Sequence, residues 1–145
     1  MSIIKPKTLQ NLKQYLLTAL ISVAIVTGMF LYSNGLPIFG IPDAKEIASV
    51  EIIDLRQGTE PKKFTEPEQL EMASKMPYFL SHRLLPTKDE SSPLITITYQ
   101  LKDGKTWMVQ TNETAVFLKG KAYPIRKKEY GDTFAKIIEG YFFCY

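Results

Sequence analysis

The sequence predicts an α+β fold in which an N-terminal transmembrane helix precedes a small antiparallel sheet with two helices packed on one face. Three observations support this prediction. The first is a long uncharged apolar run near the N-terminus. The second is a series of short segments that alternate apolar and polar residues, and the third is a helical period in the last segment. A chain of 145 residues has room for one such domain and one appended segment.

The apolar run occupies residues 15–32 and reads YLLTALISVAIVTGMFLY. As a helix, a run of this length extends about 27 Å, close to the roughly 30 Å hydrocarbon thickness of a bilayer. Tyr15 and Tyr32 at its ends are typical of membrane–water interfaces. A soluble helix that is apolar on every side needs a large surrounding core, which about 100 further residues hardly supply. We therefore expect a transmembrane signal anchor over residues 14–32.

Basic residues predict the orientation of this anchor. Lys5, Lys7 and Lys13 precede the run, and the positive-inside rule keeps such a basic flank, residues 1–13, in the cytoplasm. The predicted location is therefore the cell membrane, with a single pass and the C-terminal domain outside. Secretion after cleavage near Gly35 is the alternative, because small residues there suit a signal peptidase. The apolar run exceeds the usual length of about 7–15 residues for cleaved signals, which favours the anchor.

Residues 33–42 are predicted to form a short uncharged linker, since Gly35, Pro37 and Pro42 interrupt any regular structure there. Its apolar side chains are expected to pack on the domain rather than enter the headgroup region. Residues 43–145 should then fold as one extracytoplasmic α+β domain.

The domain opens with a predicted strand at residues 48–56, which are rich in β-branched and aliphatic side chains. A helix is expected next, because Thr65 and Glu68 match a capping box in which each side chain accepts a hydrogen bond from the other's backbone amide. This helix should reach Lys75 and stop before Pro77.

Residues 78–85 are an apolar stretch to which we assign no element, and residues 86–93 are a polar surface loop. Residues 94–101 then alternate, which predicts a half-buried strand. Its apolar side is formed by Ile95, Ile97, Tyr99 and Leu101.

A hairpin is expected directly after this strand. Asp103 and Gly104 separate it from a second strand at residues 106–111, and Asp-Gly is the favoured pair for a type I′ turn, whose two central residues need positive φ. Two further strands at residues 115–118 and 122–125 extend the meander.

The period changes at about Lys127, which predicts a closing helix. The apolar residues that should form its buried face are Tyr130, Phe134, Ile137, Ile138 and Tyr141. The helices would cover one face of the sheet and leave a Thr and Lys face in water. The aromatic C-terminal end should pack on the sheet, with Cys144 as a buried reduced thiol rather than a link to another chain.

The net charge of +3 does not indicate nucleic-acid binding. Residues 43–145 hold 15 basic and 15 acidic residues, so the whole excess belongs to the N-terminal flank. A basic face is the first requirement for a nucleic-acid partner. We therefore expect the membrane and an envelope protein as partners, and no nucleic acid.

The sequence contains no pattern that predicts catalysis. His82 is the one histidine, it lies in an apolar stretch, and no nucleophile elbow or phosphate-binding loop accompanies it. With one cysteine and one histidine, no zinc cluster can form. We assign no catalytic, cofactor-binding or metal-binding residue, expect no cofactor, and expect that the protein is not an enzyme.

A basic cluster in the second half is the one candidate binding site. Its members lie at a predicted hairpin and at the start of the closing helix: Lys119, Lys121, Arg126, Lys127 and Lys128. They could meet an acidic protein, anionic lipid headgroups or a teichoic-type polymer, or form a solvated surface. Basic residues at a helix start oppose the helix dipole, so they are not there for helix stability.

Residues 38–42 (IFGIP) lead into residues 46–52 (EIASVEI), and this opening resembles that of small Gram-positive (Firmicute) membrane-anchored extracytoplasmic proteins of unknown function. The resemblance implies an N-terminal anchor or lipid attachment and a compact α+β domain with an Asp-Gly hairpin, here Asp103-Gly104. It covers the exported domain through short motifs and transfers no catalytic residue. Some small envelope proteins of similar build are immunity proteins against secreted toxins, which gives a candidate function by analogy.

The expected function is therefore that of a membrane-tethered extracytoplasmic binding module of a bacterial envelope. Such a module could be an immunity or inhibitor protein that occludes a secreted toxin or enzyme through a sheet edge or an exposed face. The alternative is an accessory subunit of a membrane transporter or cell-wall enzyme complex. In that case the small residues Thr18, Ala19 and Ser22 would face another transmembrane helix.

Overall fold

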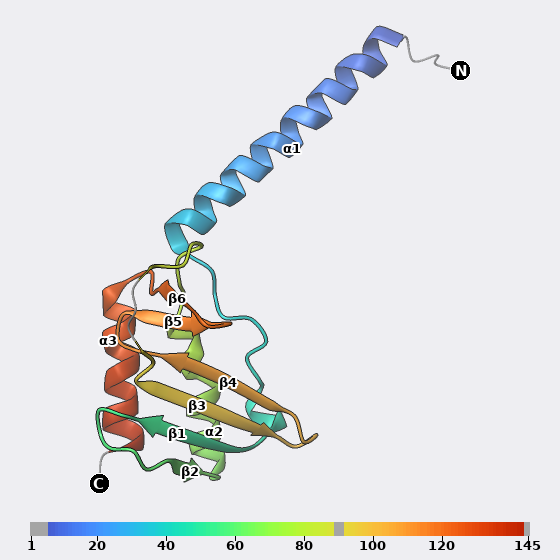
Figure 1. Cartoon of the computed structure of the whole chain (residues 1–145). Helices are drawn as coiled ribbons and strands as arrows, with labels where there is room; N and C mark the ends of the chain where they lie inside the picture. Colours follow the sequence, from blue (N-terminus) through green and yellow to red (C-terminus); the bar gives the residue numbers. More distant parts are fainter. Residues whose placement is uncertain (1–5, 89–91, 144–145) are drawn as a thin grey trace. The chain divides into compact units, whose positions relative to one another are not determined.

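The computed structural model describes residues 6–88 and 92–143, which form two compact units (Figure 1). The first unit ends at Asn34 and the second begins at Gly35. The predicted α+β fold is confirmed, with one long apolar helix, a six-stranded antiparallel sheet and two further helices.

The first unit is the helix α1 (Pro6–Asn34). Its apolar side chains lie exposed along the run, and within the described residues it is the one helix long and apolar enough to cross a membrane. Backbone hydrogen bonds within a helix satisfy its own polar groups in lipid, so these exposed side chains suit a bilayer. The helix therefore fits a single-pass membrane anchor or a signal sequence. It begins before the predicted anchor and includes Lys7 and Lys13.

The sheet of the second unit has the strand order β2-β1-β3-β4-β5-β6, and every neighbouring pair is antiparallel (Figure 1). The strands are β1 (Ile47–Asp54), β2 (Lys62–Phe64), β3 (Ile95–Leu101), β4 (Thr106–Thr111), β5 (Ala115–Leu118) and β6 (Lys121–Pro124). The sequence did not predict β2, because three residues are too short to show alternation.

Helical elements cover one face of this sheet. They are η1 (Ala44–Glu46), α2 (Pro67–Lys75), η2 (Met76–Phe79), α3 (Lys128–Ile137) and the π-helical turn η3 (Ile138–Phe142). Ile52, Ile97 and Val109 of the sheet belong to the same buried cluster as Leu70 of α2 and Phe134 of α3. The alternation predicted for β3 is confirmed, because Ile95, Ile97 and Tyr99 are fully buried while the residues between them are not, and Leu101 packs partly buried against the core.

The hydroxyl of Tyr99 is satisfied within this core. Tyr99 of β3 is fully buried, and its hydroxyl donates a hydrogen bond to the Ala73 carbonyl of α2. Burial raises the pKa of Tyr99. The bond joins sheet and helix at the centre of the unit, and a buried hydroxyl needs such a partner.

The N-terminus of α2 differs from the prediction by one residue. Glu66, not Thr65, is the capping residue, and the Gln69 side chain accepts from the Glu66 backbone amide at 3.4 Å. The physical reason is Pro67, which takes the first helical position and holds the residue before it in the extended conformation. The helix ends at Lys75, as predicted.

The type I′ turn lies in a different hairpin from the one predicted. At Asp103-Gly104 only Gly104 has positive φ, and Gly104 donates to the Leu101 carbonyl, which is a type I turn followed by a glycine bulge. The prediction for this turn was therefore wrong. Lys119 and Gly120 both have positive φ, 51° and 78°, in the two-residue turn between β5 and β6. Lysine carries no turn signal, so the sequence pattern missed it.

The prediction of the buried face of α3 is partly wrong. Phe134 and Ile138 are buried as expected, whereas Tyr130 and Tyr141 are exposed at the margin. Phe142 is buried instead. The reason is that η3 is a π-helical turn, in which the Phe143 amide donates to the Ile138 carbonyl five residues earlier, so each turn holds about one residue more than an α-helix. The Phe142 ring meets that of Phe64 in β2 edge to face, so the aromatic C-terminal end packs on the sheet. Cys144 lies outside the described residues.

The residues after α1 join the second unit directly. Ile38 is buried and Ile41 packs on the core, whereas Phe39 remains 73% exposed. Leu36 forms an isolated antiparallel bridge with His82. The predicted packing of the linker is therefore seen for most of its apolar side chains, and the linker itself is shorter because the helix continues to Asn34.

Candidate functional site

An apolar pocket lies between the residues that follow α1 and the strands β4 to β6. Its volume is about 460 Å³, within the usual range for ligand pockets. The residues that line it are Leu36, Pro37, Ile38, Phe39, His82, Leu84, Trp107, Met108, Val109, Leu118, Lys119 and Tyr123. We call it the linker pocket. Phe39 and Met108 are well exposed, so an apolar group from outside could reach it.

His82 forms one wall of the linker pocket, and its side chain is almost fully buried. Its ring meets Tyr123 edge to face with centroids 5.4 Å apart, and its Nδ1 atom has no hydrogen-bond partner among the described residues. Burial lowers the pKa of His82, an effect that the nearby Leu80 backbone partly opposes. The imidazole is therefore held neutral near pH 7, and its Nδ1 atom is shielded from solvent without a partner among the described residues.

A basic surface runs along the β6 side of the sheet. The segment 81–88 follows this strand, because Thr87 donates to the Ala122 carbonyl, Arg83 to the Pro124 carbonyl and Arg126 to the Ser81 carbonyl. We call this surface the β6 rim. Its members are Arg83, Lys88, Lys119, Lys121, Arg126, Lys127 and Lys128. All are exposed except Arg126, which is half-buried.

The β6 rim is locally unbalanced in charge. Residues 81–88 and 115–128 contain these seven cations and no aspartate or glutamate. The Lys127 ammonium lies 5.3 Å from the centre of the Tyr130 ring, which restrains it without neutralising it. Glu129 follows at the start of α3, where acids favour the helix dipole. The predicted basic patch is thus part of a larger cationic surface.

A second charged cluster is structural rather than available for binding. The Arg56 guanidinium donates two bonds to the buried Asp54 carboxylate, at 2.8 and 3.0 Å, and one to Glu113 at 2.7 Å. It also reaches the Ala135 carbonyl of α3 at 3.4 Å. Hydrogen bonds to Asp54 raise the pKa of Arg56. The cluster joins the end of β1, the turn before β5 and α3, so its donors are already engaged.

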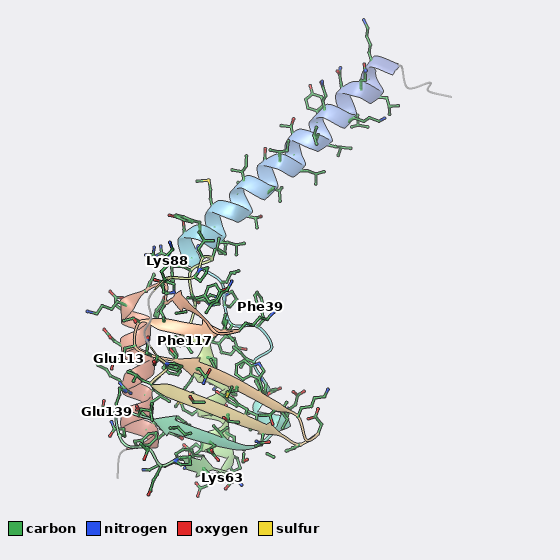
Figure 2. The ribbon with its side chains drawn as sticks, viewed as in Figure 1. Phe39, Lys63, Lys88, Glu113, Phe117 and Glu139 are labelled. Carbon is green, nitrogen blue, oxygen red and sulfur yellow. The ribbon has the colours of Figure 1, made fainter. Side chains whose placement is uncertain are left out.

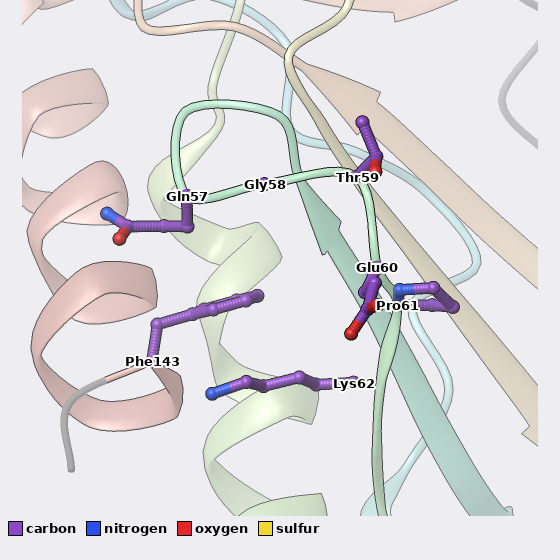
Figure 3. Close-up of a pocket in the computed structure, with 7 residues that line it drawn as sticks. All are labelled: Gln57, Gly58, Thr59, Glu60, Pro61, Lys62 and Phe143. Atoms are coloured by element: carbon purple, nitrogen blue, oxygen red, sulfur yellow. The ribbon is translucent and has the colours of Figure 1, made fainter.

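A smaller hollow of about 280 Å³ lies between the residues 57–62 and Phe143 (Figure 3). The Lys62 ammonium lies 4.8 Å from the centre of the Phe143 ring there. A larger groove of about 620 Å³ follows η1 and α2, where Lys45, Lys75 and Lys102 face Asp43 and Glu71 in near charge balance. Neither hollow has the mainly apolar and aromatic lining of the linker pocket.

Within the described residues, no group of three or more His, Cys, Asp or Glu side chains could hold a metal ion. The Nδ1 atom of His82 has no hydrogen-bond partner in that part of the chain.

Sequence reasoning missed two parts of this region. Arg83 and Lys88 belong to the stretch and loop that received no element, and the bridges to β6 bring them beside the predicted patch. The one available signal was Leu84-Leu85 between two cations, an apolar pair in an otherwise polar turn. The linker pocket was not predictable, because it combines residues far apart in the sequence.

No protein-family model, curated protein or solved structure gave a significant match to this chain.

Proposed function

We propose that this chain is a membrane-tethered binding module of a bacterial envelope, which binds a protein partner by taking an apolar side chain into the linker pocket. A partner whose active surface is covered in this way would be inhibited, as expected of an immunity or inhibitor protein. The single observation that carries the proposal is the linker pocket itself, an open apolar cavity with aromatic walls.

The chemistry of the pocket supports a protein ligand. Trp107 and Tyr123 provide large rigid surfaces, and Lys119 at the rim can pair with an acidic group beside the inserted side chain. Aromatic anchors that are surrounded by polar residues dominate the energetics of most protein interfaces. Phe39, with 73% of its surface exposed, adds an apolar contact at the mouth.

The sheet edges are less suitable for a partner than the pocket. The β6 edge is bridged by His82 and Thr87, and the β2 edge has only three residues, two of which are lysines. Added strands need a long row of free backbone groups. The sheet-edge mode of binding is therefore the weaker version of the proposal.

Tethering would serve this function. A helix such as α1 confines the domain to the bilayer, which raises its effective concentration for a partner that acts at the same surface. We expect the second unit to face outward, because basic residues precede the apolar run.

Site-specific photo-crosslinking in intact cells tests the proposal with the full-length chain. A photoreactive residue replaces Met108 at the pocket, and a control replaces Lys63 on β2. We expect one discrete protein adduct from position 108 and none from position 63. Phe39→Asp should abolish the adduct, whereas Tyr78→Asp, at a similarly exposed aromatic residue outside the pocket, should preserve it. An adduct that survives Phe39→Asp would contradict the proposal.

Replacement of α1 by an unrelated single-pass anchor separates this function from that of an accessory subunit. A binding module keeps its activity after the exchange, whereas a subunit that docks through its helix loses it. The hydroxyl of Ser22 donates to the Thr18 carbonyl of the same helix at 2.8 Å, so it has no proton left to donate to a neighbouring helix.

A further inference from the structure

The β6 rim reaches the point at which the second unit begins, where Arg126 lies beside Gly35. Gly35 is the first residue of that unit, and a side chain placed there would collide with the His82 carbonyl and meet the Cβ of Arg126. Two hydrogen bonds between Leu36 and His82, at 2.8 and 2.9 Å, fix this position. Because the residue before Gly35 is the last residue of α1, covalent connection keeps the β6 rim within a short distance of the chain's exit from its helix.

An apolar pair lies within the rim. Leu84 is 38% exposed and Leu85 is 77% exposed, and Arg83 and Lys88 flank them in the sequence. Two neighbouring exposed leucines are unfavourable in water. The same arrangement, apolar side chains among cations, is favourable at the boundary between lipid headgroups and acyl chains.

We propose that the β6 rim binds the anionic headgroups of the bilayer in which α1 is anchored, with Leu84 and Leu85 inserted at the interface. The inference rests on the anchoring role of α1 in the proposed function, but not on the partner of the linker pocket. Charge complementarity supports it, because the six exposed cations of the rim outnumber Asp89, Glu90 and Glu129, the acids next to them in the sequence, and this excess of positive charge would meet a negative surface. The rim also lies beside Gly35, where the chain leaves α1. A surface that binds the bilayer must lie near the anchor, whereas a surface that binds a soluble acidic protein could lie anywhere on the unit. This position therefore favours lipid.

Docking would restrict how the second unit moves on its tether. A unit held at two points, by the chain at Gly35 and by the rim, presents a fixed side to the membrane. The residues around Asp103 and those of β2 lie away from the rim, and they would face outward. Each cation near an anionic surface changes such a docking equilibrium by about fivefold.

The experiment uses the full-length chain with Cys144→Ser and one new labelling site, Leu85→Cys, carrying an environment-sensitive fluorophore. The protein is reconstituted in vesicles of phosphatidylcholine alone or of phosphatidylcholine mixed with phosphatidylglycerol. We expect a blue shift and a brighter emission only in the vesicles with phosphatidylglycerol. High salt should reverse the change, because it screens exposed charges.

A second label at Lys63→Cys is the matched control for position. Lys63 lies on β2, five strand spacings from β6, or about 24 Å. Figure 2 shows Lys63 and Lys88 at opposite ends of the second unit. The label at position 63 should keep a water-like emission in both kinds of vesicle.

Charge reversal tests the role of the cations. Lys121→Glu with Lys128→Glu should lower the equilibrium constant for docking at least about 25-fold, because two favourable charges are lost. Lys45→Glu with Lys102→Glu makes the same change in net charge beside β3 and should leave the signal at position 85 intact. Equal effects of the two variants would overturn the proposal.

Flotation of the vesicles at high salt separates this inference from the anchoring role of α1. Protein that floats in both kinds of vesicle, but whose label at position 85 stays water-like with phosphatidylglycerol, overturns the β6 rim proposal and leaves anchoring intact. A blue shift of equal size in phosphatidylcholine alone also overturns it, because headgroup charge would then play no part. Protein that fails to float overturns anchoring, and the rim proposal with it.

Discussion

Two glycines in the C-terminal helical region should respond to the same substitution in opposite ways. A Cβ at Gly131 of α3 would collide with the backbone carbonyl of Glu113 and would also press on the Ile125 side chain at 3.2 Å. A Cβ at Gly140 of η3 would meet nothing within 4 Å. The helix α3 therefore approaches the turn before β5 so closely that only glycine fits at position 131.

The free-energy change follows from two opposing effects. Replacing a helical glycine by alanine stabilises by up to about 1 kcal/mol, since alanine loses less conformational entropy. Forcing a methyl group against a backbone that cannot rotate away costs about 1–3 kcal/mol. The Glu113 carbonyl is held in place because the Glu113 side chain is bonded to Arg56. We expect Gly131→Ala to destabilise by about 1–2 kcal/mol and Gly140→Ala to stabilise by about 0.5 kcal/mol.

Urea unfolding of the full-length chain in detergent micelles measures both changes. Trp107 is the one tryptophan in the chain and packs on Tyr99 in the core, so its fluorescence reports on the second unit. The midpoint should fall for Gly131→Ala and rise slightly for Gly140→Ala, with unchanged slopes. A rise for Gly131→Ala would refute the inferred close approach of α3 to the turn at Glu113.

Three further predictions use the same assay. Asp54→Asn should lower the free energy of unfolding by about 2–3 kcal/mol, because it leaves the partly buried Arg56 without its main partner. Glu113→Gln, at the half-exposed end of the cluster, should lower it by at most about 1 kcal/mol. Equal losses for the two variants would contradict the assigned burial. The pKa of His82 is lowered in the folded protein, so the unfolded chain binds more protons and the free energy of unfolding should fall as the pH decreases below about 6.5. His82→Gln should flatten this dependence of stability on pH between about pH 7.5 and about pH 5.5. An unchanged slope in the variant would exclude this role of His82. Lys119→Asn should stabilise by about 0.5–1 kcal/mol, because asparagine tolerates the positive φ of the turn, and a loss of stability would argue against the type I′ geometry.

The sequence predicted the elements whose pattern repeats over several residues. The strand at β3 and the end of α2 at Lys75 were found because alternation and proline act locally. The six-stranded sheet was underestimated by one strand, since β2 is defined by its pairing with β1 rather than by its own composition. Local signals cannot show such pairing.

The errors in the turns have a different origin. Asp103-Gly104 has the preferred composition of a type I′ turn, yet it belongs to a three-residue turn with a bulge. Lys119-Gly120 lacks the preferred composition, yet both of its residues adopt positive φ. In both hairpins the turn matches the observed register, in which Gln100 pairs with Thr106 and Leu118 pairs with Lys121. Turn preferences of about 1 kcal/mol are easily overcome by the packing of whole strands.

The candidate sites were predictable only in part. Five cations of the β6 rim were identified from their clustering along the chain, whereas Arg83 and Lys88 join them through bridges that connect residues about forty positions apart. The linker pocket needs Leu36, Trp107 and Tyr123 in one place, and no pattern in the sequence relates them. Surfaces assembled from distant segments require the fold to be known first.

Neither edge of the sheet offers a long open strand to a neighbouring copy of the protein. Molecules confined to a bilayer collide in two dimensions, and neighbouring copies with long open strands would join into oligomeric ribbons. Here one margin is a strand of three residues rich in lysine, and the other contains Pro124 and is bridged by the chain around Thr87. In the membrane-anchored protein that we propose, neighbouring copies would therefore find no long open strand through which to join.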